Sequence, residues 1–207
     1  MFATALGDGG ELRPLEPWRA EEFLAHMDRA RDLVDEHMGF AQLVTDVESA
    51  REMLASKARQ QAADTGRIYG IWLESTLVGG VLFPKFDAAS GTCEVGCWLE
   101  PAGTGRGLVT RAARVLIDWA VEQRGMHRVE WRVSSANLPS VRVAQRLGMK
   151  RDGVLRESHP YRGVRQDIEV WSVLAPEWRR QTPATCGHIQ GAGHDHARPE
   201  GIPRRGA

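Results

Sequence analysis

The sequence predicts an α+β fold in which a mixed, mostly antiparallel central sheet is flanked by helices. Runs of strand-forming residues alternate along the chain with amphipathic stretches of helical period. Three of these runs follow one another with only short turns between them, which is typical of antiparallel pairing. The chain has 207 residues, of which 42% are hydrophobic, and this is enough to bury one sizeable core.

The first half of the chain begins with one strand and two helices. Glu11–Leu15 is expected to form a short strand. Pro17–Arg29 follows as a helix, with Pro17 in the first turn, where the missing N–H of proline has no cost. Asp46–Gln61 forms a second helix with Asp46 as its N-cap. The antiparallel meander comes next, as three strands over Tyr69–Glu74, Leu77–Phe86 and Thr92–Glu100, with Ser75 and Thr76 in the first turn.

The second half is expected to begin with its longest helix, Leu108–Arg124, which carries a continuous apolar stripe. Arg128–Ser134 is a further strand. A short helix follows, with Pro139 in its first turn and Gly148 placed to end it. Two last strands are expected at about Arg151–Glu157 and Arg165–Leu174.

The charge and composition exclude several classes of protein. Lys plus Arg and Asp plus Glu both number 27, so the basic surplus of a general nucleic-acid or anionic-membrane binder is lacking. No apolar run is long enough to span a bilayer, and the first residues do not resemble a signal peptide. Three cysteines make a poor disulfide framework. A cytoplasmic protein is therefore expected.

The composition changes near the C-terminus. Residues 1–178 are expected to form one domain, and residues 179–207 a disordered tail, because proline and glycine are frequent there and apolar residues are scarce. The tail also carries side chains that can bind zinc, namely Cys186, His188, His194 and His196. Since such a tail lacks a surrounding shell of ligands, no metal is expected.

A glycine-rich turn carries the most specific chemical signal. Gly103, Gly105 and Gly107 connect a strand directly to the start of the long helix. The first N–H groups of a helix have no intrahelical partner, and glycine lets a ligand approach the backbone, so this segment predicts a phosphate or pyrophosphate site. The alternative is a turn that uses glycine only for its backbone angles.

This segment resembles the GNAT acyltransferases, whose loop has the form [QR]-x-x-G-x-[GA]. Thr104–Val109 follows that pattern with Gly107 at the central glycine, although Thr104 and Val109 depart from the usual residues. The resemblance implies that the loop amides bind acetyl-CoA and that the fourth and fifth predicted strands splay apart around its pantetheine arm. The cofactor residues that it implies are Trp98, Leu99, Thr104, Gly105, Arg106, Gly107, Leu108, Val109, Thr110 and Asn137.

A second block strengthens the resemblance. Asn137, Ser140 and Gly148 match the family's segment N-x-x-S-x-x-[VL]-x-x-x-x-G-[FM]. This block and a closing R-G-x-x-x-D-x-x-x-[WY] segment, at Arg162–Trp171, resemble the RimJ/RimL subgroup. Members of that subgroup acetylate the N-terminal amines of ribosomal proteins and are often dimers.

Acetyl transfer to an amine needs a base, because a free α-amino group is half protonated near pH 8. His159 is the preferred candidate, since histidine side chains titrate near neutrality and the resemblance places this segment at the acceptor amine. Glu157, Asp167 and an ordered water are rivals, and Glu94 and Glu100 are weaker ones. The resemblance also implies that Ser140 assists the thiolate leaving group and that Asn137 contacts the pantetheine amide. Alternatively, Asn137 only caps the helix and Ser140 is a solvated first-turn serine.

The sequence therefore predicts an acetyl-CoA-dependent N-acetyltransferase whose acceptor is a primary amine, most simply a protein N-terminus. Two alternatives stay open. The acceptor is instead a small-molecule amine such as an antibiotic or a polyamine, or the protein binds acyl-CoA without turnover.

Overall fold

The computed structural model describes residues 3–38, 41–161 and 163–181. They form one sheet with the strand order β1-β2-β3-β4-β5-β6-β8-β7. The strands are β1 (Thr4–Gly7), β2 (Gly10–Pro14), β3 (Arg67–Leu73), β4 (Thr76–Asp87), β5 (Thr92–Leu99), β6 (Arg128–Ser134), β7 (Lys150–Tyr161) and β8 (Val164–Leu174). The α-helices are α1 (Ala20–Met38), α2 (Val47–Ala62), α3 (Leu108–Asp118), α4 (Leu138–Arg146) and α5 (Ala175–Gln181).

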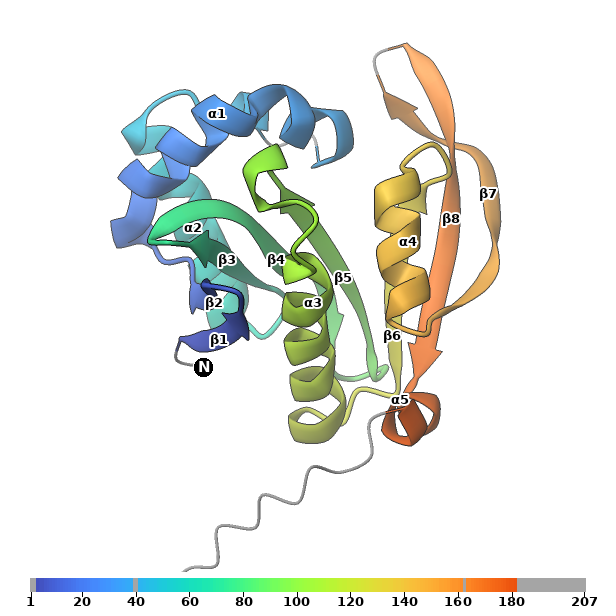
Figure 1. The fold of residues 1–207 in the computed structure, drawn as a ribbon. Coiled ribbons are helices and arrows are strands. Elements are labelled where there is room, and N and C mark those ends of the chain that lie inside the picture. The colour runs from blue at the N-terminus through green and yellow to red at the C-terminus, as the bar shows by residue number, and fades with distance from the viewer. Residues whose placement is uncertain (1–2, 39–40, 162, 182–207) are drawn as a thin grey trace, which may run out of the picture.

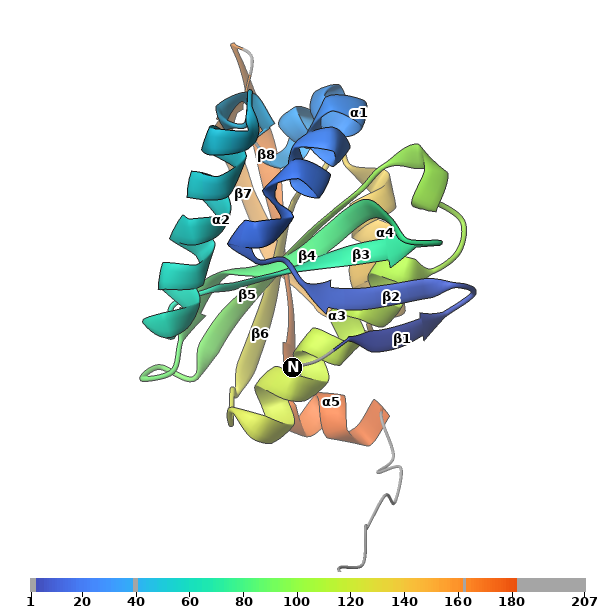
Figure 2. The same cartoon turned by 90° about the vertical axis from the view of Figure 1, so that its left-hand side faces the viewer.

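The helices cover both faces of the sheet. Helices α1 and α2 pack on one face, over β3 and β4, and enclose one apolar cluster with side chains such as Phe23, Leu54 and Leu82. Helices α3, α4 and α5 pack on the other face and enclose a second cluster around Leu116, Trp131 and Trp178 (Figures 1 and 2). The expected α+β layering is confirmed.

Most elements match the sequence prediction, with shifted ends. The N-cap at Asp46 is confirmed, and its side chain forms a capping box with Ser49. The turn between β3 and β4 lies at Glu74 and Ser75, one residue earlier than predicted, and both residues adopt positive φ. Helix α1 continues to Met38, well past the predicted end at Arg29, because Ala30 and Val34 extend its buried stripe.

The sequence analysis did not predict strand β1, the π-helical end of the long helix or helix α5. Strand β1 pairs with β2 across a turn in which Gly7, Asp8 and Gly9 all have positive φ. The Asp-Gly pair in this turn is a hairpin signal that sequence analysis overlooked. The end of the long helix, Trp119–Gln123, is a π-helix. The third element is α5, which docks on α3 through a hydrogen bond from Trp178 Nε1 to Asp118 Oδ1 of 2.7 Å.

The domain boundary expected after residue 178 falls inside α5. Arg179 Nε donates to Glu122 Oε1 over 2.9 Å, and Gln181 Nε2 donates to the Gly148 carbonyl over 3.2 Å. The folded part therefore includes at least Gln181. Residues 182–207, with the four zinc-binding side chains considered above, lie outside the described residues.

Truncation after Gln181 is expected to leave the melting temperature and the turnover number nearly unchanged. The reason is the composition of residues 182–207, which offers few apolar side chains to bury. Differential scanning calorimetry and a thiol-release assay on the truncated chain check this. A loss of several degrees would show that the segment docks on the domain, and a zinc-dependent loss of activity would show a metal site.

Strands β5 and β6 separate part-way along their length, as Figure 1 shows. They pair in parallel only at three positions, the last of which joins Glu94 to Glu130, although β5 runs on to Leu99 and β6 to Ser134. On the other side of β5, the register with β4 shifts between Leu82 and Lys85, around Pro84, which cannot donate a ladder hydrogen bond. This irregularity lies where β5 leaves β6, and the splay predicted for the fourth and fifth strands is confirmed at β5 and β6.

Candidate active site

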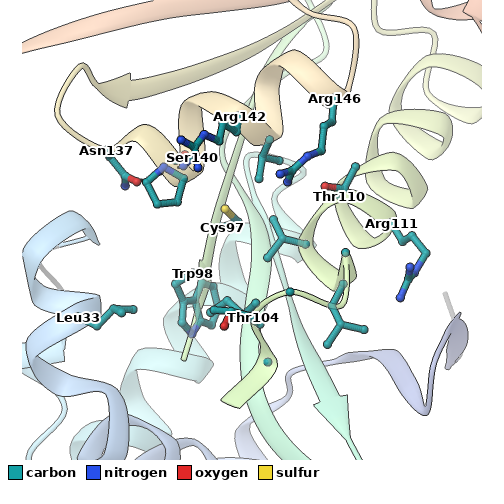
Figure 3. Close-up of a pocket in the computed structure, with 18 residues that line it drawn as sticks. Leu33, Cys97, Trp98, Thr104, Thr110, Arg111, Asn137, Ser140, Arg142 and Arg146 are labelled. Carbon is teal, nitrogen blue, oxygen red and sulfur yellow. Dashed lines mark hydrogen bonds between the residues drawn. The ribbon is translucent and has the colours of Figure 1, made fainter. Parts of the chain in front are cut away.

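A cavity of about 710 Å³ lies beside the splayed strands, between the Gly-rich turn and α4. Figure 3 shows Trp98 and Thr104 on one side of it, Asn137 and Ser140 on the other, and Cys97 between them. Nine of the ten predicted cofactor residues line it: Trp98, Leu99, Thr104, Gly105, Gly107, Leu108, Val109, Thr110 and Asn137. Arg106 does not line it, and its carbonyl accepts a hydrogen bond from Arg111 instead.

The N-terminus of α3 has the features of an anion-binding site. Gly107 is the N-cap, has a φ of 68°, and offers no side chain to cap the helix. The first intrahelical backbone bond joins Arg111 N to Gly107 O, so the backbone N–H groups of Leu108, Val109 and Thr110, which line the cavity, have no intrahelical acceptor. Positive helix-dipole charge at this end favours phosphate oxygens, and the site fits the diphosphate of a nucleotide cofactor.

Two cationic side chains of α4 were not predicted. Arg142 and Arg146 of α4 line the same cavity, on the wall that lies across from the Gly-rich turn (Figure 3). They lie four residues apart, so they share one face of the helix. Their spacing was visible in the sequence, but only the packing of α4 next to α3 directs that face toward the loop.

A second cavity of about 460 Å³ opens on the far side of the splay. Cys97, Asn137 and Ser140 line both cavities, which therefore meet in the gap between β5 and β6. His159 and Glu94 line only the second one. A group bound in one cavity can thus reach a group bound in the other without crossing a continuous strand ladder.

Asn137 and Ser140 are held in place by hydrogen bonds. Asn137 Oδ1 accepts from the Ser140 amide over 3.1 Å, so Asn137 is the N-cap of α4. Ser140 Oγ accepts from Trp131 Nε1 over 3.0 Å. Because the indole N–H occupies a lone pair of the hydroxyl oxygen, the hydroxyl proton is free to be donated into the cavity junction.

His159 lies within β7, two residues beyond the predicted strand end, and pairs with Gln166 on β8. The strand bulges just before it, between Leu155 and His159, with Glu157 at a φ of 51°. Asp167 Oδ1 accepts the Glu157 amide over 2.8 Å and so holds this bulge. Neither Glu157 nor Asp167 lines the second cavity, whereas His159 does.

Glu94 contributes a carboxyl group to the lining of the second cavity. Burial raises the pKa of its carboxyl above the usual range, against the opposing charge of Arg132. Such a carboxyl accepts a proton more readily than an exposed one. The sequence ranked Glu94 low as a base, because nothing in it shows that the carboxyl faces this cavity.

The cysteines of β5 behave as packing residues. Cys93 is buried in the core and Cys97 packs against it. Burial raises the pKa of both thiols to about 12, so they are neutral at physiological pH and poor nucleophiles.

A family comparison identifies this architecture. The family model described as an acetyltransferase (GNAT) domain matches residues 11–150. The chain belongs to the GNAT acetyltransferases. It is 31% identical to the probable N-acetyltransferase YjcK of Bacillus subtilis over 173 residues, which cover 80% of this chain and 94% of that protein. It is 27% identical to the putative ribosomal N-acetyltransferase YdaF of Bacillus subtilis over 86% of this chain and 98% of that protein.

Solved structures share the fold of this acetyltransferase. A ribosomal L7/L12 alpha-N-protein acetyltransferase, RimL, in complex with coenzyme A has a TM-score of 0.79 at 16% identity, covering 83% of this chain and 97% of that chain. The microcin C7 self-immunity acetyltransferase MccE, in complex with acetyl-CoA and AMP, has a TM-score of 0.75 at 23% identity, covering 82% and 94%. GNAT enzymes use acetyl-CoA as co-substrate, and the cavity at the start of α3 of this acetyltransferase has the donors that its phosphates need.

Arg162, which belongs to the closing motif of the sequence analysis, lies outside the described residues. Among the residues that the structure describes, no cluster of three or more His, Cys, Asp or Glu could hold a metal ion. No helix in the described ranges is both long and apolar enough to cross a membrane.

Proposed function

We propose that this acetyltransferase transfers the acetyl group of acetyl-CoA to the α-amine of a protein N-terminus, in the cytoplasm. The observation that carries the proposal is the meeting of two cavities at Cys97, Asn137 and Ser140. The larger cavity suits the cofactor, and the smaller one suits an amine that approaches from the opposite side. The amine of a polypeptide is favoured because the smaller cavity borders β7, whose exposed residues leave room for a chain.

Residues of both cavities and of the β5 edge have separate roles in this proposed reaction. Acetyl-CoA supplies an activated thioester. Beyond Glu94, the edge of β5 that faces β6 has no strand partner in the described chain, so its backbone N–H groups are available to the thioester oxygen and the pantetheine amides. His159 or Glu94 removes a proton from the acceptor ammonium. The Ser140 hydroxyl donates to the departing thiolate.

A substrate screen tests the proposal. Peptides that begin with Ser, Ala or Met are compared with aminoglycosides and polyamines, each with acetyl-CoA, by thiol release and mass spectrometry of the product. Acetylation of a peptide α-amine at a kcat/KM well above that of the small amines supports the proposal. Turnover confined to small amines would contradict the acceptor, and coenzyme A binding without turnover on any amine would point to a binding module.

Ser140→Ala is expected to lower the turnover number at every pH. The substitution removes the proton donor to the thiolate, and because deprotonation of the amine is a separate step, raising the pH does not compensate. Turnover from about pH 6.5 to 9.5 checks this. Ser135→Ala is a matched control, since Ser135 lies just after β6 and lines neither cavity. A defect that disappears at high pH would show that Ser140 acts on the amine instead.

A further inference from the structure

A polar cluster with a buried centre lies behind the cofactor cavity, on the face covered by α1. Its centre is His26 of α1, whose side chain is fully buried. The indole Nε1 of Trp98 donates a hydrogen bond to His26 Nε2 over 2.9 Å. Trp98 lines the cofactor cavity, so this bond joins α1 to a wall of the site although the two residues are 72 positions apart.

The direction of this bond determines the protonation of the ring. An indole N–H can only donate, so Nε2 carries a lone pair and the ring proton is on Nδ1. Nδ1 faces Glu100 Oε2 at 3.3 Å. The same carboxylate oxygen lies 3.3 Å from Arg29 Nε, and Arg29 Nη2 donates to the Leu77 carbonyl of β4 over 2.7 Å. The cluster therefore ties α1, β4 and the end of β5 together.

The position of the Trp98 ring is tightly constrained. Gly80 of β4 lies against it, and a Cβ at Gly80 would come within 2.2 Å of the ring. Contact with Gly80 fixes the plane of the indole, and the bond to His26 fixes the direction of its N–H. Glu100, the next member of the cluster, immediately precedes the 3-10 turn Pro101–Gly103 that leads into the Gly-rich turn.

We infer that His26 is a positioning residue: through its unprotonated Nε2 it holds Trp98, and with it the end of β5 that borders the bound pantetheine arm. The inference rests on the proposed function in that coenzyme A occupies this cavity. Removal of His26 takes away the acceptor of this buried indole N–H, and a buried donor that loses its acceptor favours a shifted ring position. The cavity wall would move with it.

The cluster also has a pH signature. Burial lowers the pKa of His26 to about 4, with Glu100 opposing this shift and Arg29 adding to it. Between about pH 6.5 and 4 the unfolded chain binds a proton at this side chain that the folded chain does not. Stability is therefore lost as the pH falls through this window, and the loss should be smaller when the imidazole is absent.

The test measures coenzyme A affinity by calorimetric titration for wild type, His26→Leu, His26→Gln, Trp98→Phe and the His26→Leu/Trp98→Phe double variant. His26→Leu should weaken binding about tenfold or more, since a buried donor loses its acceptor. His26→Gln, whose amide oxygen can accept the indole N–H, should stay within about threefold of wild type. The double variant should lose less than the product of the two single losses, because both partners are gone.

A control variant and two further measurements distinguish positioning of Trp98 from a general loss of stability. Leu54→Ala is the control: it lies in the same apolar cluster, on α2, and should lower the melting temperature without weakening coenzyme A binding. In His26→Leu, KM for acetyl-CoA should rise more than kcat falls. The melting temperature of His26→Gln should also drop less than that of wild type between pH 7 and pH 5.

The outcomes distinguish the inference from the function on which it rests. A folded His26→Leu with wild-type affinity would overturn the inference. If His26→Leu does not fold, a His26→Gln that binds as poorly as Trp98→Phe would overturn it equally. Wild-type protein that binds no coenzyme A would overturn the proposed function itself.

Discussion

Gly107→Glu is expected to abolish measurable coenzyme A binding, with an affinity loss of about 100-fold or more. Gly107 has a φ of 68°, which residues with a Cβ adopt only under strain, and a Cβ there would lie 3.1 Å from Arg111 Nη1. The new carboxylate would also stand at the end of α3 where the phosphates are expected, and like charges repel strongly at such short range. Calorimetric titration with coenzyme A measures the loss.

The control for this substitution is Gly125→Glu. Gly125 has a φ of 66°, so the backbone strain and the added charge are the same, but it lines neither cavity and has open space around its Cβ position. It should bind coenzyme A like wild type. A folded Gly107→Glu protein with unchanged affinity would contradict the assignment of the Gly-rich turn as a phosphate loop.

His159→Ala is expected to lower the turnover number by roughly 10²–10⁴-fold near neutral pH, which is the usual contribution of a general base. Coenzyme A affinity should hardly change, since His159 lines only the second cavity. The loss should shrink toward pH 9.5, because an α-amine then loses its proton without help. His127→Ala is the matched control, as His127 is exposed and lines neither cavity.

Glu94→Gln decides between the two candidate bases. If His159 is the base, Glu94→Gln should keep a wild-type pH profile from about pH 6.5 to 9.5, and His159→Ala should not. A wild-type profile for His159→Ala would transfer the role to Glu94 or to an ordered water. Asp167 is a weaker rival than the sequence indicated, because its carboxylate already accepts the Glu157 amide. Membership in the GNAT acetyltransferase family does not depend on which of these residues is the base.

Most secondary-structure elements of this protein and the caps of its helices could be predicted from the sequence alone. Alternation of apolar residues and turn residues predicts most strands and helices, because side-chain period and backbone preference are properties of neighbouring residues. The N-cap at Asp46, the glycine at the start of α3 and the cap at Asn137 were all visible for the same reason. Nine of the ten cofactor residues that the family resemblance implies line one cavity, and eight of the nine lie within the single stretch Trp98–Thr110.

The tertiary structure alone decided how separate segments meet. Arg146 faces the Gly-rich turn only because α4 packs next to α3, and Glu94 faces the second cavity only because β5 leaves β6 directly after it. His26 and Trp98 show the same limit, since no sequence pattern joins positions 72 residues apart. Such pairs form because a buried polar group is stable only with a hydrogen-bond partner. Which partner lies close enough depends on how elements distant in the sequence pack together.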